Sequence, residues 1–325
     1  MKRVWTSMLL AGLCIIPASA ALGRQPPLPG GSSSQAPAAQ HATGNSNPRI
    51  TLNTHLVSLN VTVTDSYGRF VTGLGKQHFE VFDDKVKQGV SFFSDADVPV
   101  SLGIVYDVSG SMKERINRSL KALRRFFDMA HEDDDIFLMA FNERAQLVQD
   151  FTTSPDEILG HLMFIAPRHS TALYDAMYLG VEKIQQGRHP KRALLVISDG
   201  QDNNSRYSYK ELRRLVKEAD VQIYAIGITD PASDALAGYG RSVLEEISRL
   251  TGGRAFFPDA YNEQELVEIC SRIALELRHQ YAIGFYPSDA TSKKDWHKVK
   301  VRLNPPKGLG RLTLSYRDAY RSFDK

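Results

Sequence analysis

The sequence has only two cysteines, and it lacks any apolar run long enough to span a bilayer. Cys14 lies in an N-terminal segment that we expect to be removed, which leaves Cys270 alone. A single thiol excludes an internal disulfide, so the stability of the mature chain must come from packing or from bound metal. Cys270 continues the helical apolar pattern of Leu266, Ile269 and Ile273, which predicts a buried, inert thiol rather than a nucleophile.

The sequence also lacks a strong excess of charge of either sign. Its formal net charge is +3, and removal of residues 1–20 takes away two basic residues and no acid, so +3 becomes +1. A nearly neutral chain gives no reason to expect binding to nucleic acid or to an anionic membrane surface. A basic face formed by Lys121, Arg124 and Arg125 is more typical of a solvated helix surface than of an anion site.

The N-terminus has the pattern of a signal peptide. Two basic residues precede a short apolar core at residues 8–16, and Ala18-Ser19-Ala20 supplies a small-residue cleavage site. We therefore predict a signal peptide at residues 1–20, cleaved after Ala20, and a secreted or periplasmic protein. Cys14 allows a lipoprotein alternative, but the bulky Leu13 before it disfavours that alternative.

Changes in composition and periodicity predict the domain organisation. Residues 21–48 are rich in Pro, Ala, Gly, Ser and Gln, which predicts a disordered linker. Residues 49–98 and 280–325 show short alternating strands, whereas residues 99–279 alternate apolar strands with amphipathic helices. Because few-stranded sheets are marginal alone, the two β flanks are predicted to form one small β-sandwich into which the α/β domain is inserted. Two separate small β modules remain the alternative.

The α/β stretch predicts a doubly wound, mostly parallel, six-stranded sheet with one antiparallel edge strand, because continuous apolar strands need helices on both faces. The fold class is thus α/β, with a Rossmann-like arrangement. Strands are expected at residues 102–106, 136–141, 193–197, 221–228 and 254–257, an edge hairpin at 144–151, and helices at about 113–129, 154–164, 173–187, 207–219, 240–251 and 262–279.

Oxygen-bearing side chains gather after two of these strands. Asp107, Ser109 and Ser111 follow the first strand within five residues, and Asp199 follows the strand at 193–197. Thr171 precedes an amphipathic helix on a separate loop. In an open parallel sheet, ligands bind outside the carboxyl ends of the strands, at the point where the winding direction reverses. We therefore expect these five side chains to form one metal site.

The chemistry of this set favours a hard cation. Carboxylates and hydroxyls suit Mg²⁺, or alternatively Mn²⁺ or Ca²⁺, and the absence of His and Cys from the set disfavours zinc. Two carboxylates and three neutral hydroxyls leave the cation with residual positive character and one coordination position open to an outside oxygen. A Glu or Asp carboxylate of a partner protein would fill that position.

At these residues the chain resembles the von Willebrand factor A-type domains, whose metal-ion-dependent adhesion site has the pattern D-x-S-x-S, then a Thr, then an Asp. The resemblance covers about residues 99–279, and the wider layout looks like a secreted bacterial group of such proteins. It implies cation-dependent protein binding or cell adhesion rather than catalysis. The matching segments are DVSGS (107–111), STALYDA (170–176), SDG (198–200), AIGIT (225–229) and TGGRAF (251–256).

Two other functions remain open. In the first, the chain is a scaffold protein of an envelope assembly, and its metal site is purely structural or vestigial. In the second, the chain is a secreted hydrolase that uses Ser109 with His169. The hydrolase is disfavoured because the chain has no G-x-S-x-G elbow and a serine that binds a metal does not attack a substrate. Asp202 and Asn203 are either turn formers or groups that support the ligands, and Asp175 either orients the adjoining ligand loop or stabilises a helix N-terminus.

Overall fold

The structure, a computed structural model, describes residues 55–165, 170–228, 237–259, 261–288 and 294–322. The predicted signal peptide (1–20) and linker (21–48) lie outside the described residues, as does His169. Within the described part of the chain, the helices are too short or too polar to cross a membrane.

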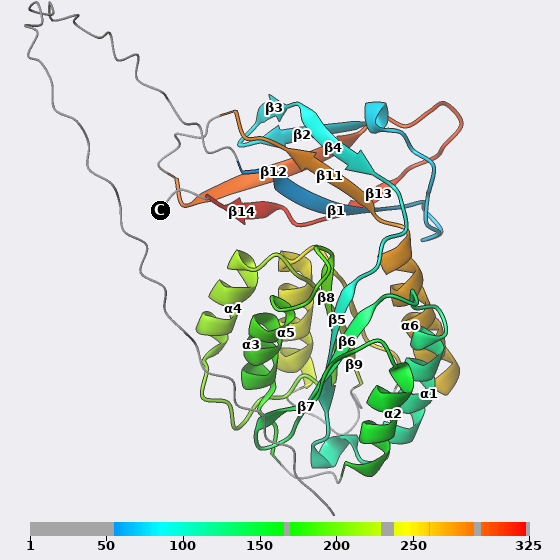
Figure 1. Cartoon of the computed structure of the whole chain (residues 1–325), viewed down its shortest axis with the longest axis vertical. Helices are drawn as coiled ribbons and strands as arrows, with labels where there is room; N and C mark the ends of the chain where they lie inside the picture. Colours follow the sequence, from blue (N-terminus) through cyan, green and yellow to red (C-terminus); the bar gives the residue numbers. More distant parts are fainter. Residues whose placement is uncertain (1–54, 166–169, 229–236, 260, 289–293, 323–325) are drawn as a thin grey trace, which may run out of the picture. The chain divides into compact units, whose positions relative to one another are not determined.

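A six-stranded sheet forms the centre of the α/β unit, in the order β10-β9-β8-β5-β6-β7 (Figure 1). Neighbouring strands run parallel, except that β7 pairs antiparallel with β6. The predicted fold class, a mostly parallel sheet with one antiparallel edge strand, is confirmed. The strands are β5 (Ser101–Asp107), β6 (Asp135–Phe141), β7 (Ala145–Thr152), β8 (Arg192–Ser198), β9 (Gln222–Gly227) and β10 (Ala255–Phe256).

Helices cover both faces of this sheet. One face carries α1, α2 and α6, and the other carries α3, α4 and α5 (Figure 1). Ile104 and Tyr106 of β5 therefore belong to one hydrophobic core and Val105 to the other, which explains why the strand is apolar at successive positions. The helices are α1 (Ile116–Phe127), α2 (Pro155–Phe164), α3 (Leu173–Ile184), α4 (Tyr209–Glu218), α5 (Ala237–Leu250) and α6 (Glu263–Arg278), with short 3-10 helices η1 (Lys76–His78) and η2 (Gly110–Met112).

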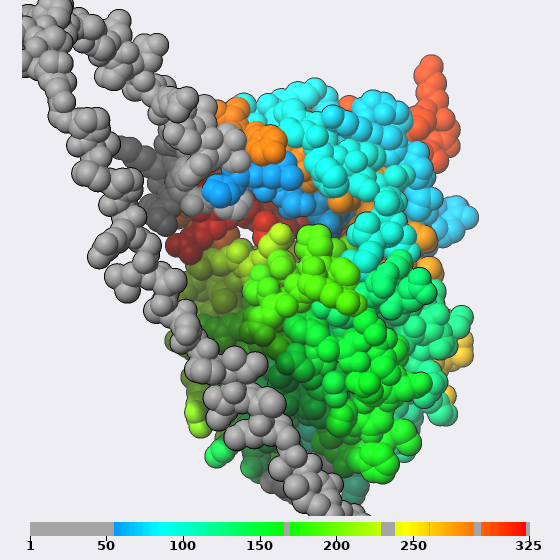
Figure 2. All heavy atoms as spheres, viewed as in Figure 1, coloured from blue at the N-terminus to red at the C-terminus, as the bar shows by residue number. Residues whose placement is uncertain are grey.

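Strands from before and after the α/β unit pair with one another in two further sheets, of order β13-β1-β11-β4 and β14-β12-β2-β3. β1 pairs antiparallel with β11, and β2 with β12. Val61 and Val301, one from each flank, belong to a third hydrophobic core. In Figure 2 the blue and cyan residues of the first flank lie against the orange and red residues of the second.

This pairing matches an α/β unit inserted between two halves of one β structure, because neither flank supplies a whole sheet. The domain boundaries given above, at 49–98, 99–279 and 280–325, stay predictions. The strands of these sheets are β1 (Val57–Thr64), β2 (Phe79–Asp83), β3 (Val86–Gln88), β4 (Val90–Ser94), β11 (Tyr281–Phe285), β12 (Trp296–Leu303), β13 (Thr313–Ser315) and β14 (Ala319–Arg321).

Candidate metal site at the edge of the central sheet

Asp107 is the last residue of β5 and is fully buried. Its Oδ1 accepts a hydrogen bond of 2.8 Å from the backbone N–H of Ser109, and its Oδ2 accepts one of 2.6 Å from Ser198 Oγ. Ser198 ends β8, which runs parallel beside β5. The adjacent ends of two parallel strands therefore hold this carboxylate in one orientation.

The chain leaves β5 through η2, which places two serine hydroxyls side by side. Ser109 Oγ lies 3.0 Å from Ser111 Oγ. Ser111 Oγ in turn donates a hydrogen bond of 2.6 Å to Asp199 Oδ2. Asp107, Ser109, Ser111 and Asp199, which are four of the five predicted ligands, are thus linked in one polar cluster.

Thr171, the fifth predicted ligand, is buried on the loop before α3. Its backbone N–H donates to Asn203 Oδ1 at 2.9 Å, and its carbonyl accepts from the backbone N–H groups of Asn203 and Asn204 at 3.0 and 3.1 Å. The loop that follows Asp199 therefore holds the Thr171 loop through backbone hydrogen bonds. These contacts fix the position of the threonine backbone at the same edge of the sheet.

Burial controls the electrostatics of the cluster. It raises the pKa of Asp107 to about 7, and the negative charge of Asp199 adds to the increase. Hydrogen bonds from Ser109 and Ser198 oppose it. A divalent cation beside Asp107 would favour the charged form of its carboxylate. A buried set of carboxylate and hydroxyl oxygens fits a hard cation such as Mg²⁺.

Polar residues that follow Asp199 in the chain hold the loops that carry the predicted ligands. Asp202 Oδ1 accepts from the backbone N–H of Tyr174 at 3.2 Å, and Asp175 Oδ1 accepts from the backbone N–H groups of Arg206 and Tyr207 at 2.8 and 2.9 Å. These contacts hold the start of α3 against the loop before α4. Asp175 thus bonds this loop from within the first turn of its helix.

Ser198 was not among the predicted ligands, although it contacts Asp107 directly. The sequence feature that could have pointed to Ser198 is its position at the end of an apolar strand, next to Asp199. A hydroxyl that bonds a ligand from outside the metal's own shell orients that ligand.

Gly200 brings the end of β8 close to α5. Its φ is +83°, and a Cβ added there would lie 2.8 Å from the carbonyl carbon of Gly240. Gly240 in α5 has the matching restriction, because its own Cβ would lie 2.6 Å from the carbonyl oxygen of Gly200. Two glycines are therefore needed for the backbone beside Asp199 to approach the helix.

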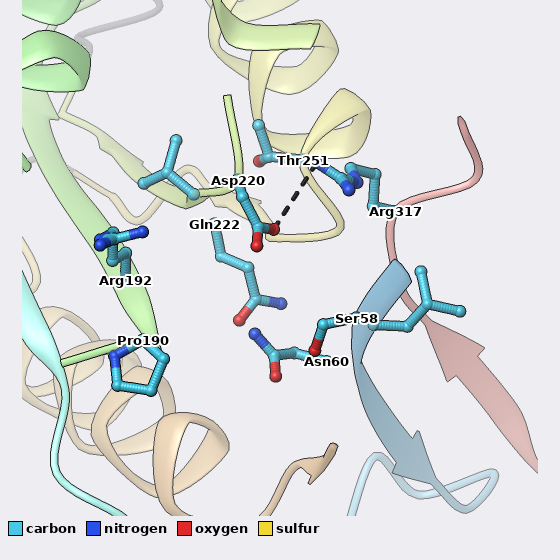
Figure 3. A pocket seen from close by; sticks show the side chains of 10 residues that line it. Ser58, Asn60, Pro190, Arg192, Asp220, Gln222, Thr251 and Arg317 are labelled. Atoms are coloured by element: carbon cyan, nitrogen blue, oxygen red, sulfur yellow. Dashed lines mark ion pairs between the residues drawn. The ribbon is translucent and has the colours of Figure 1, made fainter. Parts of the chain in front are cut away.

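A separate polar cavity lies among β1, β8 and β9, lined by Ser58, Asn60, Arg192 and Gln222 and bordered by the Asp220–Arg317 ion pair (Figure 3). Both amide atoms of Gln222 are buried there without a hydrogen bond. The room for water centres is about 20 Å³, enough for about one water molecule. This cavity suits a buried water rather than a ligand.

Residues 102–269, a little over half of the chain, match the family description "von Willebrand factor type A domain". The chain belongs to this family. Von Willebrand factor A domains are typically interaction modules rather than enzymes, and they often bind a divalent cation. Asp107, Ser109, Ser111 and Asp199 all lie within the matched residues.

The chain is also similar to several individual proteins. An uncharacterized protein of Borreliella burgdorferi is 25% identical over 221 residues, covering 62% of this chain; the chain spans 61% of that relative's length. BatB of Bacteroides thetaiotaomicron is 18% identical over 55% of this chain and 98% of its own, with a TM-score of 0.44. The PilB minor pilin of Streptococcus sanguinis is 13% identical over 57% of this chain and 63% of its own, with a TM-score of 0.45.

Proposed function

We propose that this protein is an exported interaction module that binds an acidic side chain of a partner protein through a divalent cation. The cation, Mg²⁺ or alternatively Mn²⁺ or Ca²⁺, would be held by Asp107, Ser109, Ser111, Thr171 and Asp199. The observation that carries the proposal is the hydrogen-bonded cluster of Asp107, Ser109, Ser111 and Asp199 in a von Willebrand factor A domain.

The charge of the cluster supports an outside ligand. Two carboxylates balance a divalent cation only formally, and the hydroxyls are neutral donors, so the ion keeps affinity for one more carboxylate. A partner Glu or Asp would supply it. The partner is expected outside the cytoplasm, because the N-terminal pattern predicts a signal peptide with cleavage after Ala20.

The experiment combines direct cation binding with partner capture. Isothermal titration of the full chain with Mg²⁺ should give one binding event that Asp107→Ala removes. Immobilised protein should then retain specific proteins from an envelope fraction in Mg²⁺ and release them in chelator, and Asp107→Ala should retain none of them. Partner capture that resists chelation would refute the proposal.

A structural role for the cation is the second candidate, because Ser111 bonds Asp199 and Ser198 bonds Asp107, so that the cluster already joins the ends of β5 and β8. In that case chelation would lower the melting temperature and change no interaction. A hydrolase is a third outcome, and it requires turnover of ester or peptide substrates that Ser109→Ala abolishes.

A further inference from the structure

Two acidic residues and one histidine meet within the flanking sheets. Asp83 ends β2, Asp84 follows it, and His297 lies in β12. His297 Nδ1 is 3.3 Å from Asp83 Oδ1 and 3.4 Å from Asp84 Oδ2. One atom from each of the three residues lies within 4.8 Å of the other two. Asp83 and His297 are each 4% exposed, so most of this cluster is shielded from water.

Asp83 Oδ1 and His297 Nδ1 are both buried without a hydrogen bond, although they lie 3.3 Å apart. A ring N–H pointing at the oxygen would form a bond at this distance, so the oxygen lies off the axis of the ring nitrogen. Ligands of a tetrahedral ion are arranged this way, because the ion itself occupies that axis. Ligands about 2.0–2.1 Å from such an ion lie about 3.3–3.4 Å from one another.

The surroundings hold the three ligand atoms in place. The ring of Tyr320 stacks on that of His297, with centroids 5.1 Å apart, and its hydroxyl donates to Asp83 Oδ2 at 2.8 Å. This contact leaves Asp83 Oδ1 facing the histidine. Asp84 has a φ of 43° in the tight turn between β2 and β3, and its Oδ1 accepts from the backbone N–H of Lys298 at 3.1 Å. Its Oδ2 faces the cluster.

We propose that Asp83, Asp84 and His297 form a second metal site, which binds Zn²⁺ with a water molecule as the fourth ligand. Imidazole nitrogen with two carboxylates suits zinc better than Mg²⁺, which prefers an all-oxygen octahedron. The site joins β2 of the first flank to β12 of the second, so it stabilises the pairing of chain segments on either side of the α/β unit. The ion would enter from the Asp84 side, where the side chain is 27% exposed.

Lys294 is the natural competitor for this ion. Its Nζ lies 2.9 Å from Asp84 Oδ2, the oxygen that faces His297, and it holds the pKa of Asp84 below its ordinary range. The Lys294 side chain is 63% exposed, so it is able to move away when an ion enters. Ammonium and zinc therefore compete for one carboxylate oxygen, and removal of the ammonium should strengthen zinc binding.

The test is a zinc titration of the full chain by calorimetry, in Mg²⁺ at a concentration that saturates the oxygen site. Wild type should bind one equivalent of Zn²⁺. Asp84→Asn, which keeps a residue that tolerates positive φ, and His297→Asn should each weaken binding at least tenfold, whereas Lys294→Met should strengthen it severalfold. His131→Asn removes a partly exposed histidine that pairs with Asp133 at 4.0 Å, and it should leave zinc affinity unchanged.

The melting temperature gives a second readout. Zn²⁺ should raise it in wild type and in Asp107→Ala, and should leave Asp84→Asn unchanged. If His297→Asn does not fold, Asp84→Asn and Lys294→Met still decide the question. The proposal is overturned if wild type binds no zinc under these conditions, or if zinc affinity is equal in wild type, Asp84→Asn and Lys294→Met. Because Asp107→Ala keeps this site intact, failure here is separate from failure of the Mg²⁺ proposal.

Discussion

Ser111 Oγ lies 2.6 Å from Asp199 Oδ2, although 88 positions separate the two residues in the chain. The contact exists because β5 and β8 are neighbours in a parallel sheet, so that the segments following them emerge side by side. A hydroxyl from one strand end and a carboxylate from the other are then available to the same ion.

Asp107→Asn should abolish the stabilisation of the protein by Mg²⁺. The amide preserves the shape of the side chain and can still accept from the Ser109 N–H, but it removes the charge that holds the ion. At 100 times the dissociation constant, Mg²⁺ should stabilise wild type by about 2.7 kcal/mol. Thermal unfolding with Mg²⁺ and with chelator measures the difference. A variant that keeps the full increment would show that the ion binds elsewhere.

Asn203→Ala should weaken Mg²⁺ binding about 10- to 100-fold, the usual cost of losing a group that orients a metal ligand. Asn203 Oδ1 accepts from the N–H of Thr171 at 2.9 Å and so fixes the threonine loop. Calorimetric titration with Mg²⁺ measures the change. Asn304→Ala, a matched substitution just after β12, should leave the affinity at its wild-type value. Equal affinities in both variants would mean that the Thr171 loop contributes nothing to the site.

Gly200→Ala should destabilise the protein by about 1–3 kcal/mol and also reduce Mg²⁺ affinity. The new Cβ would meet the Gly240 backbone at 2.8 Å, and relief of that contact moves Asp199. Gly73→Ala is the control, because Gly73 has a φ of +76° but no atom within 4 Å of an added Cβ. Gly73→Ala should cost only the backbone strain, about 1–2 kcal/mol, with no change in Mg²⁺ affinity. Urea unfolding measures the change in stability, and calorimetric titration measures the change in Mg²⁺ affinity.

Lys191→Met should stabilise the protein at neutral pH by raising the melting temperature several degrees. Burial, together with the nearby charge of Arg278, lowers the pKa of Lys191 to about 7. The folded protein loses this proton near pH 7, whereas the unfolded chain keeps it up to about pH 10.4. The free energy of unfolding of wild type therefore rises between about pH 7 and pH 10.4. Below pH 7 the buried Lys191 is charged in the folded protein, so the whole destabilising cost of that charge is present.

The advantage of Lys191→Met over wild type should therefore be largest at pH 6–7 and should vanish near pH 10. The lost hydrogen bond from Lys191 Nζ to the Leu277 carbonyl costs about 1 kcal/mol, which is smaller than the cost of burying the charge. Lys300→Met, an exposed substitution in β12, is the control and should show no such pH dependence. A difference from wild type that stays constant from pH 6 to 10 would contradict the assignment.

The sequence was sufficient for the central sheet because both of its faces are covered. Residues such as Ile104, Val105 and Tyr106 are buried in turn on opposite faces, so the strand reads as a continuous apolar run. Because β5 and β8 are parallel, the residues at their carboxyl ends, Asp107 and Asp199, lie at the same edge of the sheet. The helix expected at 113–129 begins later, at Ile116, because residues 113–115 form a turn between η2 and α1.

Short strands and side-chain clusters that depend on pairing between distant segments could not be predicted from the local sequence pattern. β3 and β14 have three residues each, too few for an alternating pattern to stand out. The Asp83–Asp84–His297 cluster arises because Val299 pairs with Asp83 across β12 and β2, more than 200 positions apart in sequence. No spacing rule links these residues. Ser198 was missed for a related reason, since its hydroxyl matters only through the neighbouring strand.

Crystals of the full chain grown with Mn²⁺ give the most direct measurement of the central claim, through an anomalous difference map. The account predicts a peak about 2.0–2.6 Å from the hydroxyl oxygens of Ser109 and Ser111, with Asp107, Thr171 and Asp199 around it directly or through water. No peak at this edge of the sheet, or manganese found only at the Asp83–Asp84–His297 cluster, would contradict it.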